Sequence, residues 1–271
     1  MAKVPYAEVI GDPIAQSKSP IIHRFWLQAL GIEGDYIATR VTADDLAAHF
    51  RIRRDDPDWM GSNVTLPHKQ AVFDVVDDRA GLKQTLGALN CVFGDADGGL
   101  VGTNTDAGGF LEPLENVALE GKSVAVIGAG GAARAVLLAL ASRDVRSVTI
   151  LNRTPDKGRA VLAQFGLTGT ILPLDAPVPP VDLLVNASAL GMIGQPPLVL
   201  DLSPLPASAI VYDIVYAPLE TALLAQARAR GLATIDGLAM LIGQAALAFE
   251  IFFEAHAPRE RDAELRQLLT A

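Results

Sequence analysis

The sequence predicts an α/β protein of two domains, in which an N-terminal α/β domain precedes a doubly wound parallel sheet. Three observations point to this fold class. The chain has 271 residues, which is long for one compact core, and 50% of them are hydrophobic, which is enough for two cores. Short apolar runs typical of buried strands alternate with helical patterns along most of the chain. A glycine-rich turn at residues 128–131 joins one such strand to a helix.

The first third of the chain alternates between strand and helix patterns. Its expected strands lie at residues 7–10, 36–41, 61–66, 89–93 and 100–103. Ser19-Pro20 predicts a helix start, because serine caps free amides and proline suits the first turn. Thr42 and Asp45 resemble a capping box and predict a second helix, which reaches about residue 54. Pro67 predicts the start of a third helix.

The pattern changes after Asp106 and becomes that of a parallel, doubly wound sheet. Its expected strands are apolar, and they lie at residues 123–127, 147–151, 181–185 and 210–214. Helices are expected between the first of them, at residues 132–141 and 154–165. The chain closes with two more expected helices, at residues 236–255 and 259–269.

Composition limits the partners and the compartment that we expect. The chain has 22 basic and 31 acidic residues and a net charge of −9, which disfavours nucleic acid and anionic membranes as partners. Cys91 is the only cysteine, so no intramolecular disulfide can form and a cytoplasmic location is expected. The four histidines are scattered, and no metal site is expected. The first residues lack a signal-peptide pattern, and the apolar stretch 237–253 predicts a buried helix shorter than a bilayer span.

The glycine-rich turn predicts a dinucleotide site. Glycines let the backbone bend tightly and approach a pyrophosphate closely, and the following helix offers free amides and the positive end of its dipole. Ala133 stands at the third glycine of the Rossmann fingerprint, a replacement that the fingerprint accepts. A tight turn without a ligand is the alternative. The residues expected at the pyrophosphate are Gly128, Ala129, Gly130, Gly131 and Ala132.

The end of the next expected strand indicates which dinucleotide binds. NAD enzymes place a carboxylate there, which accepts a hydrogen bond from the ribose 2′-hydroxyl. This chain has Asn152, Arg153 and Thr154 instead, with Lys157 one turn later. A guanidinium and an ammonium suit the 2′-phosphate of NADP, so NADP is the expected cofactor. A solvated basic loop is the alternative.

Further motifs occur in order over essentially the whole chain. They read GDPIAQSKSPIIH at residues 11–23, NVTLPHK at 63–69, GALN at 87–90, GTNTDAGG at 102–109, NRT at 152–154, NASALGM at 186–192 and GLAMLIGQA at 237–245. Each motif is weak alone, but as an ordered set they resemble the shikimate dehydrogenase family. Two positions depart from the family pattern, since Arg24 stands where asparagine is usual and Cys91 where threonine is usual.

The resemblance implies an NADPH-dependent enzyme that reversibly reduces 3-dehydroshikimate to shikimate in aromatic amino-acid biosynthesis. It implies Lys69 and Asp106 as the catalytic pair. The substrate-binding residues that it implies are Ser17, Ser19, Asn63, Thr65, Asn90, Tyr216 and Gln244. The further cofactor-binding residues that it implies are Ala187, Ser188, Ile214, Gly237 and Met240. It also implies a substrate domain at residues 1–106, a Rossmann domain at 107–236, and helices at 237–271 that return to the substrate domain.

The residue types support several of these roles, each with a structural alternative. Lys69 would lie in the first turn of a helix, where the dipole disfavours a cation, and this favours a function over a surface lysine. Asn63 and Thr65 alternate on one expected strand, so they face the same side, toward a ligand or toward solvent. Gln244 lies within an apolar helix and needs partners if buried, whether a polyhydroxylated ligand or a protein group. Helix caps and turns are the alternatives for Ser17, Ser19, Asn90 and Asp106.

Two other functions fit the same fold. One is a quinate/shikimate dehydrogenase that prefers NAD, against which Arg153 and Lys157 argue. The other is a non-catalytic protein that senses NADP, which would not need Lys69 and Asp106 together. In each case we expect a small molecule as the partner and a monomer or a homodimer as the assembly.

Overall fold

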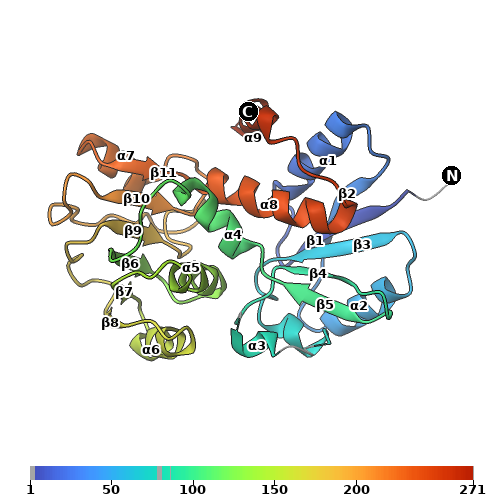
Figure 1. Cartoon of the computed structure of the whole chain (residues 1–271), viewed down its shortest axis with the longest axis horizontal. Helices are drawn as coiled ribbons and strands as arrows, with labels where there is room; N and C mark the ends of the chain where they lie inside the picture. Colours follow the sequence, from blue (N-terminus) through green and yellow to red (C-terminus); the bar gives the residue numbers. More distant parts are fainter. Residues whose placement is uncertain (1–3, 78–80, 86, 271) are drawn as a thin grey trace. The chain divides into compact units, whose positions relative to one another are not determined.

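The computed structural model describes residues 4–77, 81–85 and 87–270 of the chain (Figure 1). Contacts divide the chain into two compact units. The first unit comprises Met1–Thr105 and Gln244–Ala271, and the second comprises Asp106–Gly243. The N-terminal third and the C-terminal residues therefore build one unit, and the middle of the sequence builds the other.

The first unit contains a mixed five-stranded sheet with the order β2-β1-β3-β4-β5. Its strands are β1 (Tyr6–Gly11), β2 (Asp35–Arg40), β3 (Trp59–Val64), β4 (Cys91–Gly94) and β5 (Leu100–Thr103). β1 pairs in parallel with β2 and β3, whereas β4 pairs antiparallel with β3 and β5. Side chains alternate along β1, so Ala7 and Val9 belong to one apolar cluster and Ile10 belongs to another. Both faces of this sheet are therefore covered.

Helices cover the two faces of the first sheet. On it lie α1 (Ser19–Leu30), α2 (Leu46–Arg54), the 3₁₀ turn η1 (Ala71–Asp74) and the C-terminal part of α8 (Gly237–Phe253). The unit also contains α3 (Leu82–Thr85), α9 (Asp262–Thr270), which packs on α1, and the 3₁₀ turn η3 (Arg259–Arg261). Phe50 of α2 packs with Ile10 on one face, and Phe252 of α8 packs with Val9 on the other. A Cβ at Gly61 would lie 2.3 Å from Phe252 Cε1, so glycine lets α8 lie close to β3.

The second unit contains a six-stranded sheet with the order β11-β10-β9-β6-β7-β8, and all of its strand pairs are parallel. Its strands are β6 (Ser123–Ile127), β7 (Ser147–Leu151), β8 (Gly169–Leu172), β9 (Leu183–Asn186), β10 (Ile210–Asp213) and β11 (Ala233–Ile235). Counted from β6, this is the strand order of a Rossmann fold, in which β6 and β9 flank the point where the order reverses. Ligands of such sheets bind at the carboxyl ends of these two strands.

Helices cover both faces of the second sheet as well. They are α4 (Asp106–Leu111), α5 (Gly131–Ala141), α6 (Pro155–Gln164), α7 (Ala222–Ala229) and the start of α8, with the 3₁₀ turn η2 (Glu112–Leu114). Val124 and Val126 of β6 pack with α5 and α6 in one cluster, whereas Ala125 and Ile127 pack with α7 in another. The fully apolar run of β6 thus reflects burial on both faces.

The predicted α/β fold class is confirmed, with a parallel sheet in the second unit, and three predicted strands have the predicted bounds. The prediction of a helix that starts at Pro67 is wrong, because residues 66–70 form turns that lead into η1. The carbonyl of Lys69 accepts a hydrogen bond from Leu89 N at 2.8 Å, and this tertiary contact replaces a helical one. Thr42 does not cap α2, which begins at Leu46; its hydroxyl donates to Asp45 in the turn before the helix.

No helix within the described part of the chain is long and apolar enough to cross a bilayer. The apolar stretch that forms α8 buries Phe249 and Phe252 in the first unit. Its hydrophobicity is therefore that of a core helix.

Candidate active site

The glycine-rich loop lies between β6 and α5 in the second unit. Gly128 has a φ of 104°, and a Cβ there would lie 3.1 Å from the carbonyl oxygen of Ala187, which follows β9. Glycine alone combines this conformation with so close an approach. At Gly130, which caps α5, a Cβ would meet no atom within 4 Å. The space before α5 is open, and its first-turn amides have no helical acceptors, so a phosphate fits there.

A buried polar network holds the loops that follow β9 and β10. Asn186 ends β9, and its Nδ2 donates to Oδ1 of Asp213, which ends β10, at 2.9 Å. Asn186 Oδ1 accepts from Ser188 N at 3.1 Å and from Ser188 Oγ at 2.7 Å. Asp213 accepts from Val215 N at 3.0 Å and from Thr221 Oγ1 at 2.7 Å. Burial raises the pKa of Asp213, although these hydrogen bonds oppose the shift. The network fixes the backbone of Ala187 and Ile214 at the ligand-binding edge of the sheet.

The end of β7 presents cations and no carboxylate. Arg153 and Lys157 are exposed, and neither is ion-paired to a described residue. Asn152 Nδ2 donates to the Thr154 carbonyl at 2.7 Å, which holds the loop before α6. Asp156 lies next to this loop, but it is ion-paired with Arg159 on the same helix. The edge of the sheet therefore carries positive charge where a 2′-phosphate would bind.

The other cofactor residues expected in the second unit surround the start of α8. A Cβ at Gly237 would lie 2.4 Å from the Ile214 carbonyl oxygen, so the loop after β10 packs directly on the first turn of α8. Met240 is buried one turn later, in the apolar cluster against which Ile214 packs. Tyr216 follows in the same loop, and partial burial raises its pKa. The structure thus brings Ile214, Gly237 and Met240 together.

A buried cluster of amide side chains forms in the first unit. Asn90 Nδ2 donates to Gln244 Oε1 at 3.3 Å and to Thr105 Oγ1 at 2.8 Å. Asn90 Oδ1 accepts from Thr105 N at 2.7 Å. Asn63 Nδ2 donates to the Asn90 carbonyl at 3.1 Å, and Asn63 Oδ1 accepts from Tyr36 OH at 2.6 Å. Residues 15 to 154 positions apart in sequence therefore share one hydrogen-bonded cluster.

The sequence missed two members of this cluster. Thr105 is not among the expected substrate-binding residues, although it lies in the motif GTNTDAGG at residues 102–109, which is the signal that could identify it. Tyr36 lies on β2 in an ordinary alternating strand, where nothing in the sequence marks its hydroxyl as a partner of Asn63. Two expected residues, Asn63 and Thr65, do not share a strand, because β3 ends at Val64. Strand alternation therefore does not say which way Thr65 faces, and its place beside Asn63 stays a prediction.

The remaining expected residues of the first unit lie in loops and turns. Ser17 Oγ accepts from Ser19 N at 3.3 Å, and Ser19 is the buried first residue of α1 rather than its cap. The Lys18 ammonium donates to the Leu269 carbonyl, which ties this loop to the end of α9. Lys69 is half-buried in the turns at residues 66–70. Since no helix begins at Pro67, the helix-dipole argument for Lys69 does not apply.

Asp106 is the first residue of α4 in the second unit, and it is buried. A carboxylate at a helix start accepts hydrogen bonds from backbone amides and is stabilised by the dipole. Within the described residues, no group of three His, Cys, Asp or Glu side chains is arranged to hold a metal ion.

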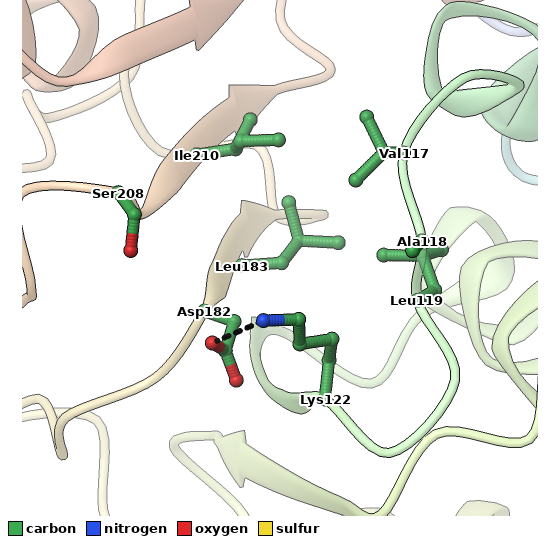
Figure 2. Close-up of a pocket in the computed structure, with 8 residues that line it drawn as sticks. All are labelled: Val117, Ala118, Leu119, Lys122, Asp182, Leu183, Ser208 and Ile210. Atoms are coloured by element: carbon green, nitrogen blue, oxygen red, sulfur yellow. Dashed lines mark hydrogen bonds and ion pairs between the residues drawn. The ribbon is translucent and has the colours of Figure 1, made fainter.

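A cavity of about 130 Å³ lies elsewhere in the second unit (Figure 2). It is lined at the amino ends of β9 and β10 by Leu183 and Ile210, and Lys122 is paired with Asp182 at its edge, 3.2 Å apart. Gly128 lies at the carboxyl end of the parallel sheet, so this cavity is not the dinucleotide site.

Comparisons with known proteins identify the family. The substrate-binding domain of shikimate dehydrogenase matches residues 9–92, the shikimate/quinate 5-dehydrogenase family matches residues 113–189, and the shikimate 5′-dehydrogenase C-terminal domain matches residues 237–264. A shikimate dehydrogenase (NADP⁺) of Sphingopyxis alaskensis is 64% identical over 98% of this chain and 97% of its own. The chain belongs to the shikimate dehydrogenase family. The resemblance seen in the sequence motifs is confirmed.

Solved structures with this fold include several members of the family. The shikimate 5-dehydrogenase of Thermus thermophilus, in complex with NADP(H) and shikimate, is 36% identical with a TM-score of 0.86 and covers 98% of this chain and 100% of its own. A ligand-free 5-ketofructose reductase of a Gluconobacter species is 31% identical with a TM-score of 0.89 and covers 99% of each chain. Because the second protein is named for a different substrate, the fold alone does not decide what is reduced.

Proposed function

We propose that this protein is an NADP-dependent shikimate dehydrogenase, which reversibly reduces 3-dehydroshikimate to shikimate in aromatic amino-acid biosynthesis. The observation that carries the proposal is the buried amide cluster of Asn63, Asn90 and Gln244. Such amides hold donors and acceptors in fixed directions, which suits a small ligand with several hydroxyl groups. Relatives named as NADP-dependent shikimate dehydrogenases indicate which ligand of this kind binds.

The reaction needs a hydride at the carbonyl carbon and a proton at the oxygen. NADPH supplies the hydride when it is bound. We assign the proton to Lys69, because an ammonium stabilises the negative charge that develops on the oxygen and then donates to it. Asp106 is the second catalytic residue of the proposal, on the strength of the motif that contains it. The substrate-binding residues are those expected from the sequence, Ser17, Ser19, Asn63, Thr65, Asn90, Tyr216 and Gln244.

The second unit carries the residues that we assign to NADP. The open space at Gly130 supports a pyrophosphate bound by the backbone of residues 128–132. Arg153 and Lys157, both exposed, are assigned to the 2′-phosphate, with Asn152 and Thr154 beside them. We assign the rest of the cofactor to Ala187, Ser188 and Ile214, which lie at the Asn186–Asp213 network, and to Gly237 and Met240 at the start of α8.

The test is a steady-state assay of the purified chain. The assay measures the oxidation of shikimate and of quinate, each with NADP⁺ and with NAD⁺. It also measures the reduction of 5-ketofructose with NADPH and with NADH. The shikimate–NADP pair should give the highest kcat/KM, with NADP at least about tenfold better than NAD, because one charge-assisted hydrogen bond contributes about 1.5–3 kcal/mol and exposure weakens it. A better turnover of either other substrate would overturn the substrate assignment.

The cofactor assignment has its own variant. Arg153→Ala should weaken NADP by roughly tenfold or more and leave NAD nearly unchanged, which removes most of the preference. Arg159→Ala is the control, since it deletes an exposed arginine of the same region that is paired with Asp156. An Arg153→Ala variant that loses both cofactors equally would mean that Arg153 contacts the adenine or supports the fold.

We also propose that the protein acts in the cytoplasm, as a monomer or a homodimer. The single cysteine, Cys91, is buried, and a chain with one cysteine forms no intramolecular disulfide, which suits a reducing compartment. Sedimentation at several concentrations measures the oligomeric state, and a larger assembly would contradict this part of the proposal.

A further inference from the structure

The hydroxyl of Tyr36 is the unusual feature of the amide cluster. Tyr36 is fully buried on β2, and its side chain reaches across β1 to Asn63 on β3. The residue beside it on β1 is Ala7, whose small side chain leaves room for the phenol. The hydrogen bond from Tyr36 OH to Asn63 Oδ1 is 2.6 Å long. A buried phenol that spans a strand to reach one amide has a specific partner.

The partners of Asn63 fix the direction of its amide. The Asn90 carbonyl only accepts hydrogen bonds, so the NH₂ group of Asn63 must face it. Oδ1 then faces Tyr36, and the phenol is the donor. Asn63 Nδ2 has two hydrogens, and the Asn90 carbonyl takes one of them. The second N–H has no acceptor within the described residues. Its direction is fixed, because the bonds to Tyr36 and to the Asn90 carbonyl fix the plane of the amide.

A neutral aromatic stack holds the phenol in place. The ring of His23 lies parallel to the Tyr36 ring, with centroids 3.9 Å apart and 8° between the planes. His23 is fully buried, and within the described residues neither of its ring nitrogens has a hydrogen-bond partner. Burial lowers the pKa of His23 to about 3, so the ring is uncharged at neutral pH. His23 therefore contributes a flat surface and does not compete for the Tyr36 hydroxyl.

We propose that Tyr36 is a positioning residue for substrate binding, which acts by orienting the Asn63 amide so that one N–H points at an oxygen of the substrate. The inference rests on the proposed function, because it takes Asn63 as a substrate ligand. It adds a residue outside the recognised motifs, and it assigns Asn63 the role of donor rather than acceptor. Without Tyr36 OH, Oδ1 is left buried without its donor, and the amide is free to turn.

The experiment is a double-mutant cycle of Tyr36→Phe and Asn63→Ala, measured as KM for shikimate, kcat and KM for NADP. Tyr36→Phe removes one oxygen and keeps the ring stacked on His23. We expect KM for shikimate to rise about threefold to tenfold, as for one lost hydrogen bond, with kcat within about twofold and KM for NADP unchanged. In the Asn63→Ala background the same substitution should change KM by less than about twofold, since a residue that acts through Asn63 has nothing left to orient.

A matched control removes the same atom elsewhere in the same sheet. Tyr6 OH donates to Asp56 Oδ2 at 2.8 Å, away from the amide cluster, and Tyr6→Phe should leave KM for shikimate unchanged. Melting temperatures of all variants report any general loss of stability. An equal rise in KM for Tyr6→Phe and Tyr36→Phe, or an undiminished effect of Tyr36→Phe beside Asn63→Ala, would overturn the inference. If Tyr36→Phe has a normal KM for shikimate and Asn63→Ala has a raised one, the inference about Tyr36 is wrong but the proposed function stands. If Asn63→Ala also has a normal KM for shikimate, Asn63 is not a substrate ligand and that part of the proposed function is wrong too.

Discussion

Glu8 carries a buried charge whose contribution to stability can be isolated by titration. It lies on β1, fully buried, and its carboxylate accepts hydrogen bonds from Arg53 at 2.8 and 3.1 Å and from Thr39 at 2.5 Å. His49 Nε2 lies 2.9 Å from Oε1, and Ser62 Oγ donates to the same oxygen at 3.0 Å. Burial alone would raise the pKa of Glu8, but these partners outweigh it and lower the pKa to about 2. The charged form is thus strongly favoured by folding.

The sign and size of the effect follow from this shift. A carboxyl whose pKa falls on folding contributes stability above its unfolded pKa of about 4.5, and the contribution is lost as the pH falls toward about 2. A difference of about 2.5 pKa units, at 1.36 kcal/mol each, corresponds to roughly 3 kcal/mol. Glu8→Gln should therefore destabilise the first unit by about 3 kcal/mol at pH 7, and more if Arg53 is left without its partner.

The assay is urea unfolding followed by tryptophan fluorescence between pH 2 and 7 at fixed ionic strength. Both tryptophans, Trp26 and Trp59, belong to the first unit, and Trp59 Nε1 donates to the Ser62 hydroxyl that in turn contacts Glu8. Other carboxyl groups titrate in both chains, so the wild-type minus Glu8→Gln difference isolates Glu8. That difference should shrink by about 3 kcal/mol between pH 5 and pH 2.

Two results would refute this reasoning about Glu8. One is a difference between the two chains that stays constant over the whole pH range, which would mean that Glu8 does not titrate on unfolding. The other is an equal loss of stability in Asp74→Asn, the control, which breaks the exposed ion pair between Asp74 and Lys83. Exposed pairs of this kind contribute little, so the control should unfold like the wild type.

Two further predictions concern the active site. Lys69→Ala should lower kcat by roughly 10²–10⁴-fold, the usual loss for a positioned acid, while the dissociation constant for NADP stays unchanged; near-normal turnover would remove Lys69 from catalysis. Gln244→Ala should raise KM for shikimate roughly tenfold to a hundredfold, because it removes a buried amide that accepts a hydrogen bond from Asn90 Nδ2 and that we assign to the substrate. A lower melting temperature with an unchanged KM for shikimate would instead make Gln244 a structural residue.

The sequence predicts elements best where one local signal dominates. β6 and the loop at Gly128 follow from a fully apolar strand run before glycines, and the bounds of β6 agree with the prediction. β8 and β11 were missed, since β8 is a largely exposed edge strand without alternation and β11 has three residues. α7 is short and follows a proline-containing loop, so its periodicity is weak.

The prediction of a helix from Pro67, where the structure has a turn that contains Lys69, failed for a different reason. Pro67 is a good first residue of a helix, but the chain around it makes tertiary hydrogen bonds instead, from His68 Nε2 to the Val41 carbonyl at 2.7 Å and from Leu89 N to the Lys69 carbonyl. Local preference cannot reveal such contacts, because their partners are 27 and 20 residues away. The hydrogen bond from Tyr36 to Asn63 could not be predicted for the same reason, because its partners are 27 residues apart.

The two polar residues at the end of β3 show how a strand separates stability from binding. Successive side chains of a strand face opposite sides of the sheet, so Ser62 and Asn63 cannot serve the same site. Ser62 is paired in register with Glu8 and joins its charged network beneath α2, whereas Asn63 is paired with Val9 and joins Tyr36 and the amides on the other face. A shift of one residue in the β1–β3 register would exchange them, placing an amide against the Glu8 carboxylate and a hydroxyl in the amide cluster. The buried carboxylate of Glu8 opposes that shift, because Ser62 Oγ donates to it from the position that is its register partner on β3. The network that stabilises one face of the sheet thereby also favours the register that places Asn63, a proposed binding residue, on the other.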